Sequence, residues 1–184
     1  VADQADGAVS VRYGDTVVLT TVRSEKPVEG DFLPLIVDYR ERTYAAGRIP
    51  GGFFKREGRP KDKEILTARL IDRPIRPLIP ESFNLEIQRV STVLSSDQEN
   101  DSDVLAVVGG SAALAISSIP FGGPVGAVRM GRIGGEWVIN PTFSRLPDSD
   151  LNLVVIGREG KTLTLEGSAK GVTEEDLQRA IELS

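Results

Sequence analysis

The chain has 184 residues, of which 40% are hydrophobic and 27% charged, as is usual for a folded soluble protein. This length suits one domain with a sizeable core, or at most two small ones. Cysteine and histidine are absent. This excludes disulfides, thiolate catalysis, zinc sites with nitrogen or sulfur ligands, and imidazole acid–base chemistry.

Charge is unevenly distributed along the chain. The net charge is −5, which taken alone argues against nucleic-acid binding. Residues 40–76, however, hold eleven basic and five acidic side chains, a balance of +6, so the rest of the chain carries −5 − 6 = −11. A cationic face on an acidic body can bind a polyanion and stay soluble.

The first third of the chain predicts strands followed by a loop and a helix. Residues 9–13 and 16–22 flank a Gly14-Asp15 turn and indicate a hairpin, and residues 33–39 are a third strand candidate. Residues 45–60 hold four glycines and two prolines and predict a loop. Residues 62–77 predict a helix with Asp62 as N-cap, which Pro74 would end or kink.

The rest of the chain alternates between short strands and two helices. We expect strands at residues 87–94, 125–132, 136–140, 151–157 and 162–166. Residues 102–118 predict a helix rich in small side chains, and Thr173 caps a last helix over 174–184. Runs of strands with a few helices indicate an α+β fold, with mixed and antiparallel sheets.

Three features of the sequence bear on where the protein is located. No signal peptide is visible, and the lack of cysteine fits the cytoplasm. Residues 104–128 carry no charge, but glycines and prolines interrupt them and leave fewer than the ~20 apolar residues that a membrane span needs. We therefore expect a buried core helix and no membrane partner.

Residues 51–59, the 51–59 loop, are the first candidate binding site. Two adjacent aromatics, Phe53 and Phe54, precede two adjacent cations, Lys55 and Arg56, and Arg59 ends the motif. Aromatic faces stack on unpaired bases, while lysine and arginine meet phosphates. The alternative is that both phenylalanines enter the core and the cations are merely solvated.

A second candidate lies in the following predicted helix. Arg69, Arg73 and Arg76 are spaced i, i+4 and i+7, so they project from one helix face. A cationic stripe of this kind favours an anionic partner. The alternative is a set of structural salt bridges, for which Asp72 and Glu64 are candidates.

These motifs resemble the polynucleotide phosphorylase family, specifically its first RNase PH-type domain. The resemblance runs from about residue 6 to about residue 165. It is most specific in the 51–59 loop and the helix after it. The residues that carry it are FFKREGR at 53–59, RLIDRPIRP at 69–77, YAAGRIPGG at 44–52, VLSSD at 93–97, IPF at 119–121 and GEWVINP at 135–141.

The resemblance implies a function and a quaternary structure. Members degrade RNA from the 3′ end, using phosphate to release nucleoside diphosphates. Their subunits carry two RNase PH-type domains and form a homotrimeric ring around a channel. The resemblance implies that the 51–59 loop contacts single-stranded RNA at the entrance of the channel. It also implies that the following helix contacts RNA near the active site of the companion domain. The implied RNA-binding residues are Phe53, Phe54, Lys55 (where arginine is commoner), Arg56, Arg59, Arg69, Arg73 and Arg76.

The same comparison argues against a complete catalytic site in this chain. Active members hold phosphate with Ser or Thr-Arg at the turn before the small-residue helix, where this chain has Asp101 and Asp103, which would repel phosphate. They also present Asp, Asp and Lys where this chain has Ser144, Asp150 and Asn152. We expect no catalytic and no metal-binding residues here. The companion domain would bind the Mg²⁺ and phosphate of the whole enzyme.

Asp148 and Asp150 have two interpretations, a polar turn before a strand or a lone Mg²⁺ site, and we favour the turn. For the whole chain we expect one RNase PH-type domain over residues 1–184, cut from a longer polypeptide at both ends. Two other functions remain open. One is a stand-alone phosphorolytic RNase PH-type enzyme, and the other is a non-catalytic subunit of an exosome-like ring.

Overall fold

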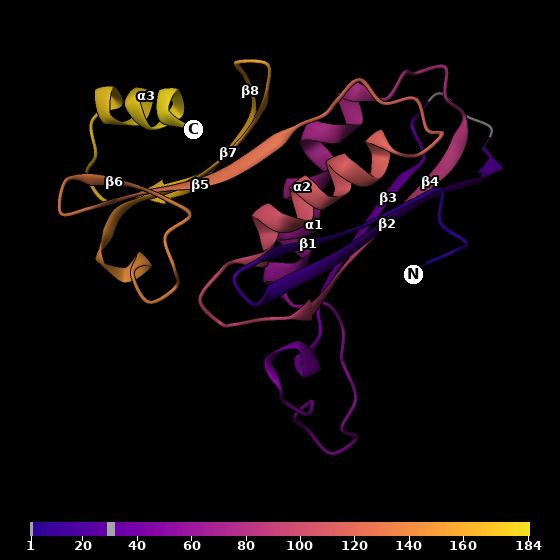
Figure 1. Ribbon diagram of the computed structural model, residues 1–184, viewed down its shortest axis with the longest axis horizontal. Helices are drawn as coiled ribbons and strands as arrows, with labels where there is room; N and C mark the ends of the chain where they lie inside the picture. The colour runs from indigo at the N-terminus through magenta and orange to yellow at the C-terminus, as the bar shows by residue number, and fades with distance from the viewer. Residues whose placement is uncertain (1, 29–31) are drawn as a thin grey trace.

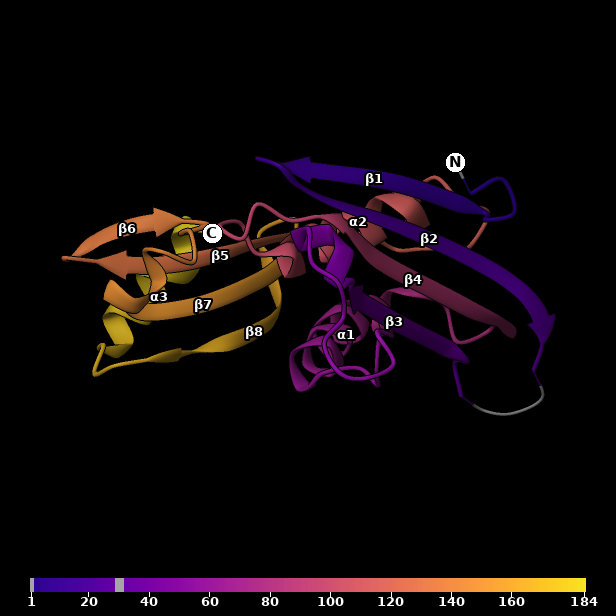
Figure 2. The ribbon, with the colours of Figure 1, turned by 90° about the horizontal axis from the view of Figure 1, so that it is seen from below.

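A computed structural model describes residues 2–28 and 32–184. It has two four-stranded sheets and three α-helices, which confirms the α+β prediction (Figures 1 and 2). In chain order the elements are β1 (Gly7–Tyr13), β2 (Thr16–Pro27), β3 (Leu35–Glu41), η1 (Thr43–Ala46), α1 (Asp62–Ile75), η2 (Arg76–Leu78), β4 (Leu85–Ser95), α2 (Ser102–Ala115), β5 (Gly126–Ile133), β6 (Glu136–Ile139), η3 (Leu146–Asp148), β7 (Ser149–Arg158), β8 (Lys161–Ala169) and α3 (Glu174–Leu183).

The first sheet has the strand order β1-β2-β4-β3. β1 and β2 form the expected hairpin, with Gly14 at φ +58° in the turn, a conformation that glycine adopts without strain. β2 pairs with β4 antiparallel and β3 pairs with β4 parallel, so the sheet is mixed. The chain between β3 and β4 carries the 51–59 loop and α1 and returns to the same sheet, which brings both candidate sites to the β3 side.

The second sheet, β6-β5-β7-β8, is antiparallel throughout and lies beside the first (Figure 2). α2 packs against β1 and β2, and α1 against β3. One core extends from these helices to Val154 and Ile156 of β7, so the two sheets share it. A smaller core lies under α3, where Ala180 packs with Met130, Leu151 and neighbouring side chains.

Helix ends differ from the predictions in three places. The N-cap of α1 is Lys61 rather than Asp62, because Glu64 reaches back and accepts a hydrogen bond from the Lys61 backbone N–H at 2.7 Å. α1 ends at Ile75, two residues before the predicted end and one residue after Pro74, which lies inside its last turn. α2 stops at Ala115, three residues early. Thr173 caps α3 together with Asp176, as predicted.

Candidate nucleic-acid interface

The 51–59 loop projects away from the body of the molecule below β1 and α1 in Figure 1. All nine of its residues are exposed, and the side chains of Phe53 and Phe54 are 93% and 79% accessible. Their rings contact each other edge to face, with centroids 5.4 Å apart. The alternative in which these phenylalanines enter the core is therefore wrong.

The base of the loop is fixed, although its tip is open to solvent. The Glu57 carboxylate accepts hydrogen bonds from the Thr43 backbone N–H at 2.7 Å and from Thr43 Oγ1 at 3.0 Å. The backbone hydrogen bond from Thr43 is the main cause that holds the pKa of Glu57 below its usual value. Arg48 Nη2 donates to Gln98 Oε1 at 3.1 Å on the other side. The loop is thus tied to η1 and to the turn after β4.

The cations of the loop face solvent. Lys55, Arg56 and Arg59 are exposed, and none of them forms an ion pair within residues 2–28 and 32–184. Lys55 has a positive φ of 51°, which places it in the left-handed region next to Gly52 at φ 80°. Three cations and two aromatic faces therefore lie on one short projecting segment, a combination that suits an unpaired nucleic-acid strand.

The arginines of α1 do not act as one stripe. Arg69 is exposed, and Arg73 Nη1 lies 3.5 Å from Glu166 Oε2 of β8. Arg76 is committed to the fold. Its Nη2 lies 2.7 Å from Asp72 Oδ1, and its guanidinium donates to the carbonyls of Leu33 and Leu35. Arg76 thus forms a structural salt bridge, as the alternative interpretation predicted. Arg73 forms a longer ion pair and remains half exposed.

A groove of about 410 Å³ lies between α1 and β3. Arg69 and Arg76 both line it, together with apolar side chains that include Val37, Ile65 and Ala68. Arg73 is not among the lining residues and points to β8 instead. The groove places Arg69 next to Pro60, at the end of the loop.

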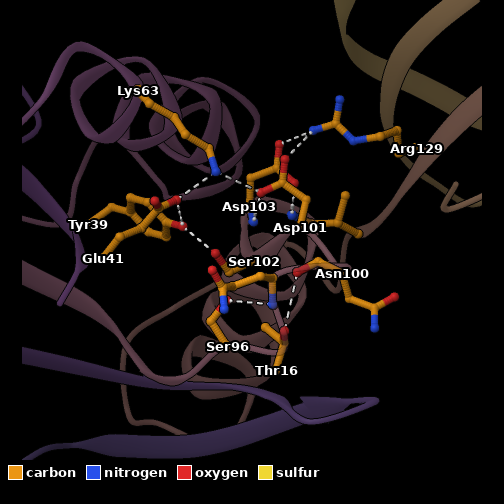
Figure 3. A network of polar contacts seen from close by, with 12 residues as sticks. Thr16, Tyr39, Glu41, Lys63, Ser96, Asn100, Asp101, Ser102, Asp103 and Arg129 are labelled. Atoms are coloured by element: carbon orange, nitrogen blue, oxygen red, sulfur yellow. Dashed lines mark hydrogen bonds and ion pairs between the residues drawn. The ribbon is translucent and has the colours of Figure 1, made fainter. Parts of the chain in front are cut away.

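At the start of α2, Asp101 and Asp103 face cations of the chain itself (Figure 3). Arg129 Nη2 bonds both carboxylates, and Lys63 Nζ lies 3.1 Å from Asp101 Oδ1 and 2.8 Å from Glu41 Oε1. Burial, and then the charge of Asp101, raise the pKa of Asp103 to about 6 against the effect of Arg129. These aspartates are therefore neutralised internally rather than presented to solvent.

The positions compared with a catalytic Asp, Asp and Lys are also internally paired. Ser144 Oγ donates to Glu99 Oε2 at 2.6 Å, and Asn152 Oδ1 accepts from Arg129 Nη1 at 2.5 Å. Asp150 pairs with Arg132 at 2.8 Å, and the hydrogen bond from Arg132 holds the pKa of Asp150 below its usual value.

Nowhere in the described ranges do three or more Asp, Glu, His or Cys side chains gather as metal ligands would. The side chains of these described residues therefore do not fit a Mg²⁺ ion.

Four residues around the base of the loop were not among the predicted site residues. Arg42, Tyr44, Arg48 and Lys61 flank the loop in sequence, and Arg42, Arg48 and Lys61 line a second pocket there. Tyr44 and Arg48 lie in the YAAGRIPGG motif that carries part of the family resemblance, whereas the signal for Arg42 and Lys61 in the sequence was the excess of positive charge over residues 40–76. The pocket forms where η1 packs against the end of β4, which is distant in the sequence. The spacing of Arg42, Arg48 and Lys61 along the chain therefore could not distinguish them from ordinary solvated cations.

The helices within the described ranges are all too short or too polar to cross a membrane.

Two family models match the chain. Domain 1 of the 3′ exoribonuclease family matches residues 1–120, and domain 2 of that family matches residues 123–184. The boundary falls between the two sheets, with β1 to β4 and α2 in the first match and β5 to α3 in the second.

Relatives and a solved structure agree with this assignment. The chain is 58% identical to the polyribonucleotide nucleotidyltransferase of Thermomicrobium roseum over 98% of its own length, and 54% identical to that of Methylacidiphilum infernorum over 100%. It spans only 23% and 26% of those proteins. A solved structure described as the Archaeoglobus fulgidus exosome with RNA bound to the active site superposes with a TM-score of 0.83. It is 18% identical, over 100% of this chain and 81% of that one, and shows the fold.

The sequence match, both family models and the fold therefore lead to one conclusion: the chain belongs to the 3′ exoribonuclease family, as an RNase PH-type domain of the polynucleotide phosphorylase (polyribonucleotide nucleotidyltransferase) kind.

Proposed function

We propose that this chain is the RNA-guiding first core domain of a polyribonucleotide nucleotidyltransferase. The whole enzyme degrades RNA from the 3′ end by phosphorolysis and releases nucleoside diphosphates. In this proposal the 51–59 loop holds single-stranded RNA by its bases and phosphates, and Arg69 and Arg73 contact the strand further along. Arg76, whose guanidinium is held by Asp72 and by the carbonyls of Leu33 and Leu35, supports the end of α1 in this proposal and has at most an indirect role in RNA binding.

The observation that carries the proposal is the exposure of Phe53 and Phe54. Two large apolar rings in water are unfavourable unless a partner covers them. Stacking a base on an aromatic ring contributes roughly 1–3 kcal/mol per base, and neighbouring cations attract the phosphates between the bases. Lys55, Arg56 and Arg59 stand beside the rings without internal ion pairs in the described structure, so the loop has both kinds of contact available.

In this proposal the phosphorolytic reaction takes place in a second RNase PH-type domain of the same polypeptide, the companion domain. The chain spans about a quarter of the relatives it matches, which leaves room for a second RNase PH-type domain that would bind Mg²⁺ and phosphate. The internal pairing of Asp101, Asp103 and Asp150 supports this division of labour. A homotrimeric, cytoplasmic ring would place the loops of three subunits around one channel, and the Archaeoglobus fulgidus exosome, which was solved with RNA bound to the active site, shares the fold.

RNA binding is tested by titrating a fluorescent oligo(A) strand with the purified chain at low salt. We expect Phe53→Ala with Phe54→Ala to weaken binding by at least tenfold, because two stacking contacts are lost. Phe32→Ala is the matched control, since Phe32 is also exposed, at 67%, but lies outside the loop. Equal affinities for the double variant and the control would refute the loop as an RNA contact.

Catalysis is tested by incubating the chain with poly(A), inorganic phosphate and Mg²⁺. We expect no release of nucleoside diphosphates. Release at a rate above the blank would instead support a stand-alone RNase PH-type enzyme. A third possibility, a non-catalytic exosome-like ring subunit, predicts no activity and no loss of RNA binding when the loop phenylalanines are removed.

A further inference from the structure

A second pocket lies at the base of the 51–59 loop and has a volume of about 220 Å³. Three separate segments wall it: η1 with the residues on either side, the start of α1, and the end of β4 with the first turn of α2. Phe143, from the segment after β6, lines it as well. The loop tip and the groove beside Arg69 do not contribute to this pocket.

The charge of the pocket is strongly positive. Four cations line it, namely Arg42, Arg48, Lys61 and Lys63, against one acid, Glu41. The Glu41 carboxylate is already engaged by Lys63 Nζ at 2.8 Å and by the hydroxyl of Tyr39 at 2.8 Å. A concave site with a net positive lining concentrates anions.

Three of these cations, Arg42, Arg48 and Lys61, form no ion pair within the described ranges. The charges of Arg42 and Lys61 help to keep Glu57 ionised. Asp101 and Asp103 do not line the pocket: Arg129 bonds both, and Asp101 also pairs with Lys63 at 3.1 Å (Figure 3). These cations offset the charges of the two aspartates, which weakens the repulsion expected between them and a phosphate.

The pocket is held in shape before any ligand enters. The Ser96 backbone N–H donates to the Ala45 carbonyl at 2.9 Å, which ties η1 to the end of β4. The Phe143 backbone N–H donates to the Glu99 carbonyl at 2.9 Å, which fixes the aromatic wall. A preformed site loses less conformational entropy when it binds a ligand.

The remaining lining groups indicate what kind of anion would fit. Thr43, Ser96 and Ser102 line the pocket. The Thr43 hydroxyl donates to Glu57 and the Ser102 hydroxyl bonds the Tyr39 hydroxyl, so Ser96 is the one of the three whose hydroxyl proton has no acceptor in the described structure and can donate to an anion. The ring of Phe143 offers an apolar face, with Lys63 Nζ 5.3 Å from its centroid. The volume is below the ~300–1,000 Å³ of pockets that enclose drug-sized ligands, so it suits a phosphate group with part of its nucleoside rather than a whole cofactor.

We propose that this pocket, centred on Arg42, Lys61 and Phe143, binds the phosphate end of a nucleotide. The phosphate meets the cations and the Ser96 hydroxyl, and the sugar or base packs on Phe143. The phosphate could belong to a free nucleotide or to a residue of an RNA strand. The site does not require RNA binding by the loop tip, so it can be tested separately from the proposed function.

The test is a titration of the isotopically labelled chain with ADP and, separately, with inorganic phosphate, followed by amide chemical shifts. We expect ADP to shift the amides of Thr43, Ser96, Ser102 and Phe143 at low salt, and phosphate to shift the same amides with weaker binding. Arg42→Gln with Lys61→Gln should weaken ADP binding at least tenfold. Arg23→Gln with Lys26→Gln, two cations of β2, is the matched control and should bind as the parent does.

Three results would refute the proposal that this pocket binds a nucleotide phosphate. These are no shifts with millimolar ADP, shifts confined to the 51–59 loop, or unchanged ADP affinity in an Arg42→Gln, Lys61→Gln variant that keeps the parent's unfolding midpoint. Competition then identifies the source of the phosphate. Displacement of ADP by oligo(A) places an RNA phosphate in the pocket, whereas simultaneous binding assigns it to a free nucleotide.

Discussion

The guanidinium of Arg89 fills the space that a side chain at Gly110 would need. A Cβ at position 110 would lie 1.7 Å from Arg89 Nη2. Arg89 points inward from β4, is 1% exposed, and donates to the Ala106 carbonyl of α2. Its Nε and Nη1 have no hydrogen-bond partner among the residues that the structure describes, and burial lowers its pKa. The close approach of α2 to the first sheet thus depends on glycine at position 110 and on a buried Arg89 cation that the charge of Asp72 offsets only in part.

This relationship predicts non-additive effects on stability. We expect Gly110→Ala to destabilise the chain by about 1–3 kcal/mol, as overpacking does. Arg89→Val removes the clash and the unpaired buried charge, so Gly110→Ala should cost much less in that background. Urea unfolding of the two single variants and the double variant measures the coupling. Additive free energies of unfolding would show that Arg89 and Gly110 do not compete for space.

Asp97 anchors the turn that follows β4 and should stabilise the chain in a pH-dependent way. Burial opposes its charge, but hydrogen bonds from the backbone of Asn100 and Glu99 and from the side chains of Asn100 and Thr16 outweigh this effect. They hold the pKa of Asp97 well below its usual 3.8. A depressed carboxyl pKa stabilises the fold above the unfolded-state value and loses this effect as pH falls through the folded-state value.

We therefore expect Asp97→Asn to reduce the free energy of unfolding by roughly 1.5–3 kcal/mol at pH 7. The difference from the parent should shrink as the pH falls below about 4. Asp15→Asn is the control, because the Asp15 carboxylate pairs with Arg12 on the surface of the neighbouring turn and has no other partner among the described residues. A difference that stays constant down to pH 2 would contradict the role of the Asp97 charge.

Arg129 neutralises two carboxylates at the start of α2, so its removal should be costly at neutral pH. We expect Arg129→Met to destabilise the chain by roughly 3–5 kcal/mol at pH 8, since Asp101 and Asp103 would remain without this cation. The pKa of Asp103 is already raised to about 6. A raised carboxyl pKa favours the fold at low pH, and this effect is lost as pH rises through about 6.

The loss caused by Arg129→Met should therefore be smaller at pH 5 than at pH 8, because Asp103 can take up a proton in the folded variant. Unfolding midpoints at the two pH values test this. Arg12→Met, which removes an exposed ion pair, should change stability by less than about 1 kcal/mol at both. An equal loss at pH 5 and pH 8 would mean that Asp103 does not titrate there.

The loop cations should control the salt dependence of RNA binding. Replacing Lys55, Arg56 and Arg59 by alanine removes up to three phosphate contacts. The slope of log K against log salt should then fall by about 2, at ~0.7 per single-strand phosphate. A matched triple variant of exposed cations elsewhere, Arg12, Lys26 and Lys161 to alanine, should leave the slope nearly unchanged. An unchanged slope in the loop variant would refute phosphate contact there.

Local patterns were sufficient to predict most of the fold. Strand alternation, the Gly14 turn and the glycine-rich loop are properties of neighbouring residues, so the strands and helices were predicted to within a few residues of where the structure has them. The N-cap of α1 was missed because the side chain of Glu64, three residues on, replaces the expected Asp62 cap.

The site was harder to predict because arginines with the same helical spacing have different partners in the folded chain. Arg69, Arg73 and Arg76 look alike in the helix pattern. Yet the carbonyls of Leu33 and Leu35 that engage Arg76 are about forty residues away in the chain, and the partner of Arg73 is further still. Long-range pairing of this kind follows from the packing of α1 between β3 and β8, which no local pattern encodes.

The ion pair between Arg73 and Glu166 provides a last test of the α1 surface. The two side chains are about half exposed and 3.5 Å apart, so the pair contributes at most about 1 kcal/mol to stability. If Arg73 also meets RNA, Glu166 competes with the phosphate for it. Glu166→Gln should then leave the unfolding midpoint nearly unchanged and raise the affinity for oligo(A) by up to about fivefold at low salt. Glu159→Gln is the control, since Glu159 pairs with Arg158 at the β7–β8 turn. Equal affinities of the two variants would remove Arg73 from the RNA-binding surface.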